Sequence, residues 1–134
     1  AFVEHLKQQP DAVLINNSSI LAFLPLVTNA LYSATKAAIH SYTLSQRFLL
    51  RDVGVKVIEI SPPWVDTDLI YKSGDSRAMP LADFIQQTFD KLATDSIEAI
   101  VDSVLPARAN QGVNEHEMVN TFNQSMVDNP IPVA

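Results

Sequence analysis

The sequence contains no cysteine and little glycine, and both shortages exclude particular kinds of site. Without cysteine, the chain can form neither a disulfide nor a thiolate metal site. Its three glycines, Gly54, Gly74 and Gly112, are scattered along the chain. None lies in a glycine-rich turn between a strand and a helix, where backbone amides could hold the pyrophosphate of a dinucleotide.

Positive charge is also scarce, and no long apolar run is present. Nine basic side chains against fifteen acidic ones give a net charge of -6, which argues against nucleic acid or an anionic membrane as the main partner. No apolar run approaches the roughly 20 residues of a membrane span, and the N-terminus shows no signal-peptide pattern. These absences lead us to expect a cytoplasmic, globular protein.

The length of the chain fits a single domain that spans all 134 residues, 1–134. The chain begins at Ala1, within a helix-like segment and without a methionine. We therefore expect this domain to be a piece of a longer protein.

Chemically capable side chains are concentrated between Ser18 and Lys36. Ser18 and Ser19 follow an apolar run, and Tyr32 and Lys36 lie four residues apart at the start of a predicted helix, so they share one helix face. A lysine near a tyrosine favours the phenolate and lowers the phenol's pKa from its reference near ~10. Such a phenol can act as a general acid or base. The pair alone also arises by chance, because both side chains are common at the edges of amphipathic helices.

The hydrophobic pattern predicts alternating helices and strands. Two short apolar runs, at 12–16 and 55–60, predict parallel strands covered on both faces. Helical spacing predicts four helices, at 1–9, from Thr28 or Asn29 to about Arg51, at 83–92, and at 96–107 with Pro106 marking its end. Gly54 is predicted to close the long helix in a left-handed conformation. The polar segment 66–80 is predicted to be a mobile segment over the site.

These motifs resemble the short-chain dehydrogenases/reductases. The resemblance runs from about Ala12 to Leu69, through the segments AVLINNSSI, LYSATKAAIHSYTLSQRFLL and VKVIEISPPWVDTDL. In that family the catalytic serine precedes the catalytic tyrosine by thirteen positions, as Ser19 precedes Tyr32. The resemblance implies that Tyr32 donates or accepts the proton. It also implies that Lys36 modulates the pKa of that phenol and binds the cofactor ribose, and that the Ser19 hydroxyl orients the carbonyl.

The resemblance further implies a cofactor, NAD or NADP, and contacts to its nicotinamide end. Family members carry a proline–glycine pair and then a threonine after the second of these strands; Pro62, Val65 and Thr67 match that pattern, whereas Pro63 stands where glycine is usual. Thr67 also fits an ordinary helix cap. The glycine-rich turn and the catalytic asparagine of the family would precede Ala1.

The fold implied by the resemblance is α/β, a partial Rossmann-like, doubly wound parallel sheet in three α/β/α layers, truncated on its N-terminal side. The implied function is NAD(P)-dependent interconversion of a carbonyl and an alcohol in a small-molecule substrate. The alternative is a non-catalytic fragment that acts as a helix-mediated assembly module. A serine hydrolase is disfavoured, because Ser18 and Ser19 lack the glycine-flanked nucleophile elbow.

The corresponding family helix commonly packs against its mate, so we expect a homo-oligomer through the helix 30–51. This helix carries a stripe of small residues that would allow close approach of a sheet or a second helix: Ala30, Ala34, Ala37, Ala38, Ser41 and Ser45. We predict no metal site. Glu115, His116 and Glu117 are adjacent in the sequence and so do not share a helix face.

Two features have more than one interpretation at the level of sequence. The apolar loop 23–27 fits either the wall of a substrate pocket or ordinary packing against the sheet. His40 lies on nearly the same helix face as Tyr32, and it fits either a functional or a structural role.

Overall fold

Three parallel strands form the centre of the molecule. The computed structural model describes residues 2–69 and 74–131. The helices and strands are, in chain order, α1 (Phe2–Leu6), β1 (Ala12–Asn17), α2 (Ala30–Leu50), β2 (Val55–Ile60), α3 (Leu81–Leu92), β3 (Glu98–Ala99), α4 (Leu105–Ala109) and α5 (Glu115–Asp128). Single turns of 3-10 helix occur at η1 (Ile20–Ala22), η2 (Val27–Asn29) and η3 (Asp102–Val104).

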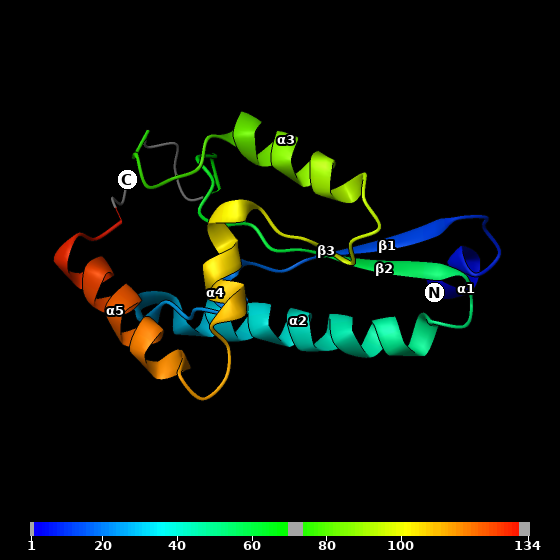
Figure 1. Cartoon of the computed structure of the whole chain (residues 1–134), viewed down its shortest axis with the longest axis horizontal. Helices are drawn as coiled ribbons and strands as arrows, with labels where there is room; N and C mark the ends of the chain where they lie inside the picture. Colours follow the sequence, from blue (N-terminus) through cyan, green and yellow to red (C-terminus); the bar gives the residue numbers. More distant parts are fainter. Residues whose placement is uncertain (1, 70–73, 132–134) are drawn as a thin grey trace.

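The strand order is β1-β2-β3, and both pairs of strands are parallel. β1 and β2 run side by side over their whole length, from Ala12 opposite Val55 to Asn17 opposite Ile60. Figure 1 shows α2 on one side of this sheet and α3 on the other. The prediction of a partial, three-layer α/β fold with a parallel sheet is therefore confirmed.

Apolar packing attaches α2 to one face of the sheet. Leu50, near the end of α2, forms a buried cluster with Ala12, Val55 and Val57 of the two long strands. Complete burial of one such side chain contributes roughly 1.5–3 kcal/mol. On the opposite face of β1, Val13 and Ile15 are each 45% exposed, so the described residues cover this strand on one side only.

A second apolar cluster incorporates the loop that follows β1. Phe23 of this loop is buried against Ile100, Val101 and Val104. Two more side chains of the same loop, Leu24 and Leu26, are also buried. The apolar character of segment 23–27 is thus largely explained by ordinary packing.

The prediction of a helix over 96–107 is wrong. Residues Glu98–Ala99 form the strand β3, and Pro106 lies in the first turn of the short helix α4 rather than at a helix end. The Glu59 amide of β2 donates a hydrogen bond of 3.0 Å to the Ile97 carbonyl, which draws this segment to the sheet. The periodicity of a short apolar run with β-branched residues does not distinguish a strand from a helix. Here the run pairs with the open edge of β2 and forms a strand.

The buried residues of the long helix α2 are not those of the predicted small-residue stripe. Ser33, His40, Thr43 and Leu50 are its buried residues, whereas all six members of the predicted small-residue stripe are exposed. The stripe therefore does not pack on the sheet. Gly54, beyond the helix end, has a φ of 73°, which confirms the predicted left-handed position.

None of the helices in the described ranges is both long and apolar enough to cross a membrane.

An ion pair fixes α4 to the short third strand. The guanidinium of Arg108 donates two hydrogen bonds to the Glu98 carboxylate, at 3.1 and 3.0 Å. Partial burial by itself raises the pKa of Glu98. The hydrogen bonds and charge of Arg108, with smaller contributions from Arg47 and His40, outweigh burial and hold that pKa below its usual value near 4.5. The pair thus stabilises the fold only while Glu98 is ionised.

We predict that Arg108→Gln lowers the free energy of unfolding by about 1 kcal/mol near neutral pH. Because the pKa of Glu98 is lower in the folded than in the unfolded chain, this stabilisation is present above the unfolded value. It is lost as the pH falls through the folded value. Urea unfolding from about pH 7 to about pH 3 should show the two proteins converging at the acidic end.

Lys91→Gln is the matched control for this measurement. Lys91 makes one contact of 3.1 Å with Asp102 in an exposed ion pair, so its replacement should change the free energy of unfolding by less than about 0.5 kcal/mol. Equal effects of the two substitutions, or a difference at Arg108 that persists in acid, would contradict the role given to Glu98.

Candidate active site

The loops that follow β1 and β2 are joined by backbone hydrogen bonds. The Ser18 amide donates to the Ile60 carbonyl and the Ile20 amide to the Pro62 carbonyl, each at 2.8 Å. Parallel strands end at the same edge of a sheet, which is where α/β folds place their ligands. The hydrogen bonds continue the β1–β2 pairing into the loops and hold Ser19, which lies between the two donors, beside the exit of β2.

Ser19 is buried in an extended conformation at the start of η1. Its hydroxyl oxygen accepts a hydrogen bond of 3.1 Å from the Leu21 amide and so caps this turn. A serine hydroxyl has one proton and two acceptor positions, and the cap uses an acceptor position. The proton is therefore chemically suited to a second task, such as a hydrogen bond to a substrate oxygen.

Tyr32 and Lys36 lie in the first two turns of α2, and their side chains are close together. The ammonium nitrogen of Lys36 is 5.5 Å from the centroid of the Tyr32 ring. The same nitrogen donates a hydrogen bond of 3.1 Å to the carbonyl of Asn17, the last residue of β1. Tyr32 is 43% exposed. Lys36 thus links the exposed phenol to the strand end that precedes the serine pair.

The three residues predicted to contact the nicotinamide end follow β2. The Pro62 carbonyl is used in the loop connection described above, and Val65 forms a parallel bridge with Met79. The Thr67 hydroxyl accepts a 3.4 Å hydrogen bond from the Leu69 amide within a turn. Of the predicted mobile segment 66–80, residues 70–73 lie outside the described residues.

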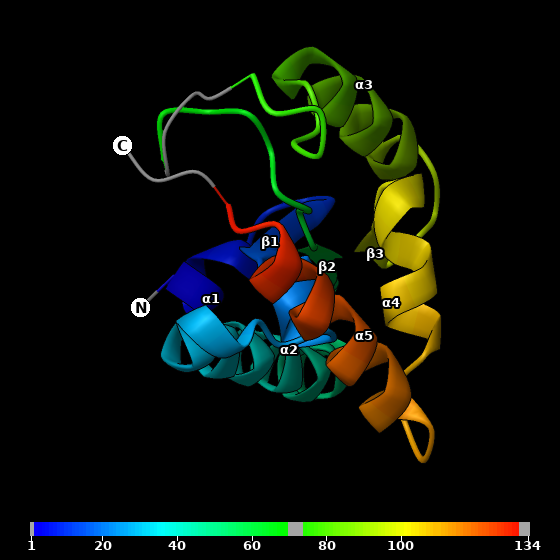
Figure 2. The ribbon, with the colours of Figure 1, turned by 90° about the vertical axis from the view of Figure 1, so that its left-hand side faces the viewer.

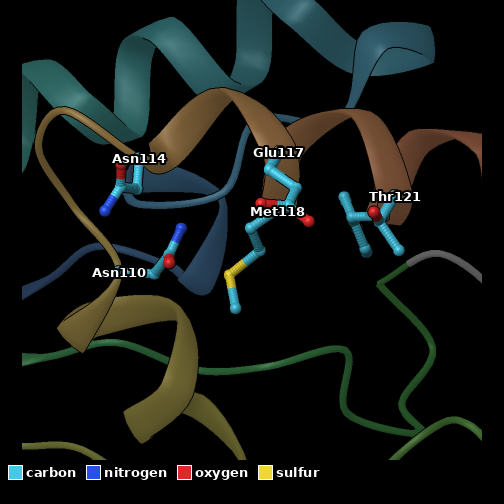
Figure 3. Close-up of a pocket in the computed structure, with 6 residues that line it drawn as sticks. Asn110, Asn114, Glu117, Met118 and Thr121 are labelled. Atoms are coloured by element: carbon cyan, nitrogen blue, oxygen red, sulfur yellow. The ribbon is translucent and has the colours of Figure 1, made fainter.

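A hollow in the described part of the chain lies away from these residues. Figure 3 shows it beside α5 and the loop before this helix. Its lining residues are Asn110, Asn114, Glu117, Met118, Thr121 and Phe122. None of them is a predicted site residue, and the lining is formed by the C-terminal part of the chain, where the sequence motifs had ended.

His40 does not join Tyr32 at the surface. It is buried beneath the loop that follows β1, with its Nδ1 atom 2.8 Å from the Glu59 carboxylate and its ring packed edge-on against Phe23. Ser18 donates its hydroxyl proton to the same carboxylate rather than to an imidazole. A serine–histidine hydrolase arrangement is therefore not formed by these residues.

One side chain that the sequence did not single out holds the loop between Ser19 and Tyr32. Asn123, on α5, accepts a 2.7 Å hydrogen bond from the Val27 amide and donates one of 2.9 Å to the Pro25 carbonyl. No local signal could have found it, because its partners are 96 and 98 residues away in the sequence. Figure 2 shows α5 in front of α2 and the sheet.

A family model described as short chain dehydrogenase matches residues 1–78. The chain belongs to the short-chain dehydrogenase family. The match covers β1, α2 and β2 together with every predicted site residue of this dehydrogenase chain, and it ends before α3.

Several relatives of this chain are named as uncharacterized oxidoreductases. The DltE protein of Bacillus subtilis is 49% identical over 78 residues, which are 58% of this chain and 31% of the relative. A Staphylococcus epidermidis protein is 46% identical over 69 residues, or 52% of this chain and 30% of the relative. The matched part of the chain thus spans about a third of the length of these relatives.

The fold is similar to that of a solved structure, a short chain dehydrogenase from Burkholderia cenocepacia J2315 in complex with NADP. The TM-score is 0.75 at 23% identity, and the alignment covers 90% of this chain and 52% of that chain. The fold similarity therefore extends well beyond residue 78, into the part that the family model does not match.

We predict that Asn123→Ala loosens the loop between the serine pair and the tyrosine. Loss of both backbone partners should lower the free energy of unfolding by about 1–2 kcal/mol and speed hydrogen exchange at the Val27 amide. Asn120→Ala, an exposed position on the same helix, is the control and should change neither quantity. Unchanged exchange at Val27 in the Asn123 variant would show that α5 does not hold this loop.

Proposed function

We propose that this chain provides the proton-transferring part of an NAD(P)-dependent oxidoreductase that interconverts a carbonyl and an alcohol. The observation that carries the proposal is the position of Lys36. Its ammonium lies beside the Tyr32 ring and is hydrogen-bonded to Asn17, two residues before Ser19. The three residues of the proposed site are thereby associated with one edge of the sheet, where this class of fold binds ligands.

In the direction of carbonyl reduction, the Tyr32 phenol would give its proton to the substrate oxygen. The nearby Lys36 ammonium would stabilise the phenolate that remains, because the two charges are opposite. The Ser19 hydroxyl would hydrogen-bond the same substrate oxygen and orient it. In alcohol oxidation the Tyr32 phenolate would accept the proton of the substrate hydroxyl, and Ser19 would again orient the substrate oxygen.

The residues present fit one end of a nicotinamide dinucleotide. Lys36 has three N–H donors and uses one for the Asn17 carbonyl, so a ribose hydroxyl could take another. The loop with Pro62, Val65 and Thr67 would adjoin the nicotinamide. A bound nicotinamide would supply or accept the hydride.

The pyrophosphate end of the cofactor requires a glycine-rich turn that this sequence does not contain. We propose that the chain, residues 1–134, forms the C-terminal portion of a Rossmann-fold dehydrogenase and that residues before Ala1 supply that turn. The edge position of β1 among the described strands supports a larger sheet, and the exposed Val13 and Ile15 on its face support further covering elements. The NADP bound to the structural relative supports a dinucleotide cofactor, without selecting NADP over NAD for this chain.

Self-association through α2 is part of the same proposal. The stripe of small residues on this helix is exposed, as are its large apolar residues Leu44 and Phe48. A second copy of the helix could approach the stripe closely and remove these side chains from water. The homo-oligomer expected for this family would use this surface.

We predict that Tyr32→Phe, made in the complete enzyme, lowers turnover by at least about 100-fold, because the proton donor is lost. The dissociation constant for the reduced cofactor should stay within about threefold of the original value, since the ring and Lys36 remain. Tyr42→Phe is the matched control on the same helix and should leave turnover unchanged. Normal turnover in the Tyr32 variant would refute the assignment.

Binding of a dinucleotide separates the proposed oxidoreductase from the alternative, a non-catalytic module that assembles through α2. We expect the complete protein to bind NADH or NADPH, with energy transfer from Trp64, the one tryptophan in this chain, to the reduced nicotinamide. Fluorescence titration and size-exclusion chromatography separate the two functions. A stable dimer that binds neither dinucleotide would favour the module.

A further inference from the structure

A fully buried carboxylate lies at the centre of the elements that carry the proposed site. Glu59, on β2, has no solvent-exposed surface. A buried carboxylate is costly unless hydrogen bonds compensate for the lost water. Its oxygens meet the Ser18 hydroxyl at 2.5 Å and the His40 Nδ1 atom at 2.8 Å. Both partners are themselves buried, so water does not compete for these contacts.

Ser61 extends this cluster to the loop after β2. Its hydroxyl oxygen is 2.8 Å from that of Ser18 and 3.4 Å from the Glu59 carboxylate. Either hydroxyl can be the donor in the short contact between the two serines. Ser61, Ser18 and Glu59 thus form one hydrogen-bonded cluster.

Each partner of Glu59 belongs to a segment that carries a proposed site residue. Ser18 precedes Ser19 directly, and His40 lies two helical turns after Tyr32 on α2. Ser61 precedes Pro62. One side chain on β2 thus connects the serine loop, the tyrosine–lysine helix and the loop at the nicotinamide end.

We propose that Glu59 and His40 are positioning residues that set the placement of the Ser19 hydroxyl relative to the Tyr32 phenol. This inference rests on the proposed function. The amides of Ser18 and Ile20 are held by the backbone of β2 and its loop, and the contact with Glu59 holds the Ser18 side chain as well. Ser19 is therefore fixed from both sides.

The energetics favour a positioning role over a purely stabilising one. A buried polar cluster rarely stabilises a fold more than apolar side chains of similar volume would. A misplacement of a reacting group by about 1 Å, in contrast, can cost about 100-fold in rate. Hydrogen bonds are directional, so the cluster specifies the geometry that apolar packing would leave less defined.

Two substitutions at Glu59 separate position from stability. Glu59→Leu removes every hydrogen bond to the carboxylate and fills the position with an apolar side chain. Glu59→Gln retains an oxygen that can accept from Ser18, and its amide group can donate to neutral His40 at Nδ1. We expect Glu59→Leu to lower kcat by at least about tenfold with KM nearly unchanged, and Glu59→Gln to restore kcat to within about threefold of the original value.

Ser18→Ala tests the connection to the serine loop with a small, conservative change. It should lower kcat like Glu59→Leu, and the double variant should lose no more than either single one, because both break the same contact. Turnover is measured in the complete enzyme with NADH or NADPH and a panel of aldehydes and ketones. Unchanged kcat in folded Glu59→Leu or in Ser18→Ala would overturn the inference, as would equal losses in Glu59→Leu and Glu59→Gln.

Amide exchange distinguishes failure of this inference from failure of the proposed function. Both Glu59→Leu and Ser18→Ala should speed hydrogen exchange at the Ile20 amide by about tenfold, while the Leu14 amide in β1 stays protected. Absence of turnover in the unsubstituted enzyme would refute the proposed oxidoreductase. Unchanged exchange at Ile20 in both variants would refute the positioning role, whatever the turnover.

Discussion

The parallel pairing of β1 with β2 is the constraint on which the rest of the structure depends. The two strands end opposite each other, with Asn17 beside Ile60, so the loops that follow them leave the sheet at one edge. Two further backbone hydrogen bonds, from Ser18 and Ile20, continue the pairing beyond the strands. Residues separated by more than forty positions are thereby held together without any contribution from their own side chains.

Buried hydrogen bonds between α2 and the strands add to the apolar packing of this helix on the sheet. Leu50 attaches the end of α2 to the sheet by apolar packing, whereas His40 and Thr43 contact it through hydrogen bonds with Glu59 of β2 and Asn16 of β1. Hydrophobic packing tolerates small shifts, but a hydrogen-bonded cluster around a buried carboxylate does not. These hydrogen-bonded contacts lie nearer to Tyr32 and Lys36 along the helix than Leu50 does. The part of the helix that needs an accurate position is thus held by directional contacts.

The C-terminal part of the chain holds the sheet and the loop after β1 through contacts that no sequence motif predicts. β3 covers the open edge of β2, and α5 reaches back to the loop between the proposed catalytic residues through Asn123. The family model ends before these elements, although the fold similarity extends beyond residue 78. A loop can be held by many different side chains as long as its backbone groups find partners. Such a support therefore carries no sequence signal near the loop that it holds.

The resemblance to the short-chain dehydrogenases pointed to Ser19, Tyr32 and Lys36 as candidate site residues. The sequence alone determined the elements whose signals are local: the two long strands, the helix from Ala30 to Leu50, and the left-handed Gly54. These follow from periodicity and residue type within a few positions of each other. Tertiary structure alone decided that 96–107 contains a strand, that His40 is buried against Glu59, and that Asn123 holds a loop. Each of these depends on a partner distant in sequence, and local pattern carries no information about which distant group will satisfy a hydrogen bond.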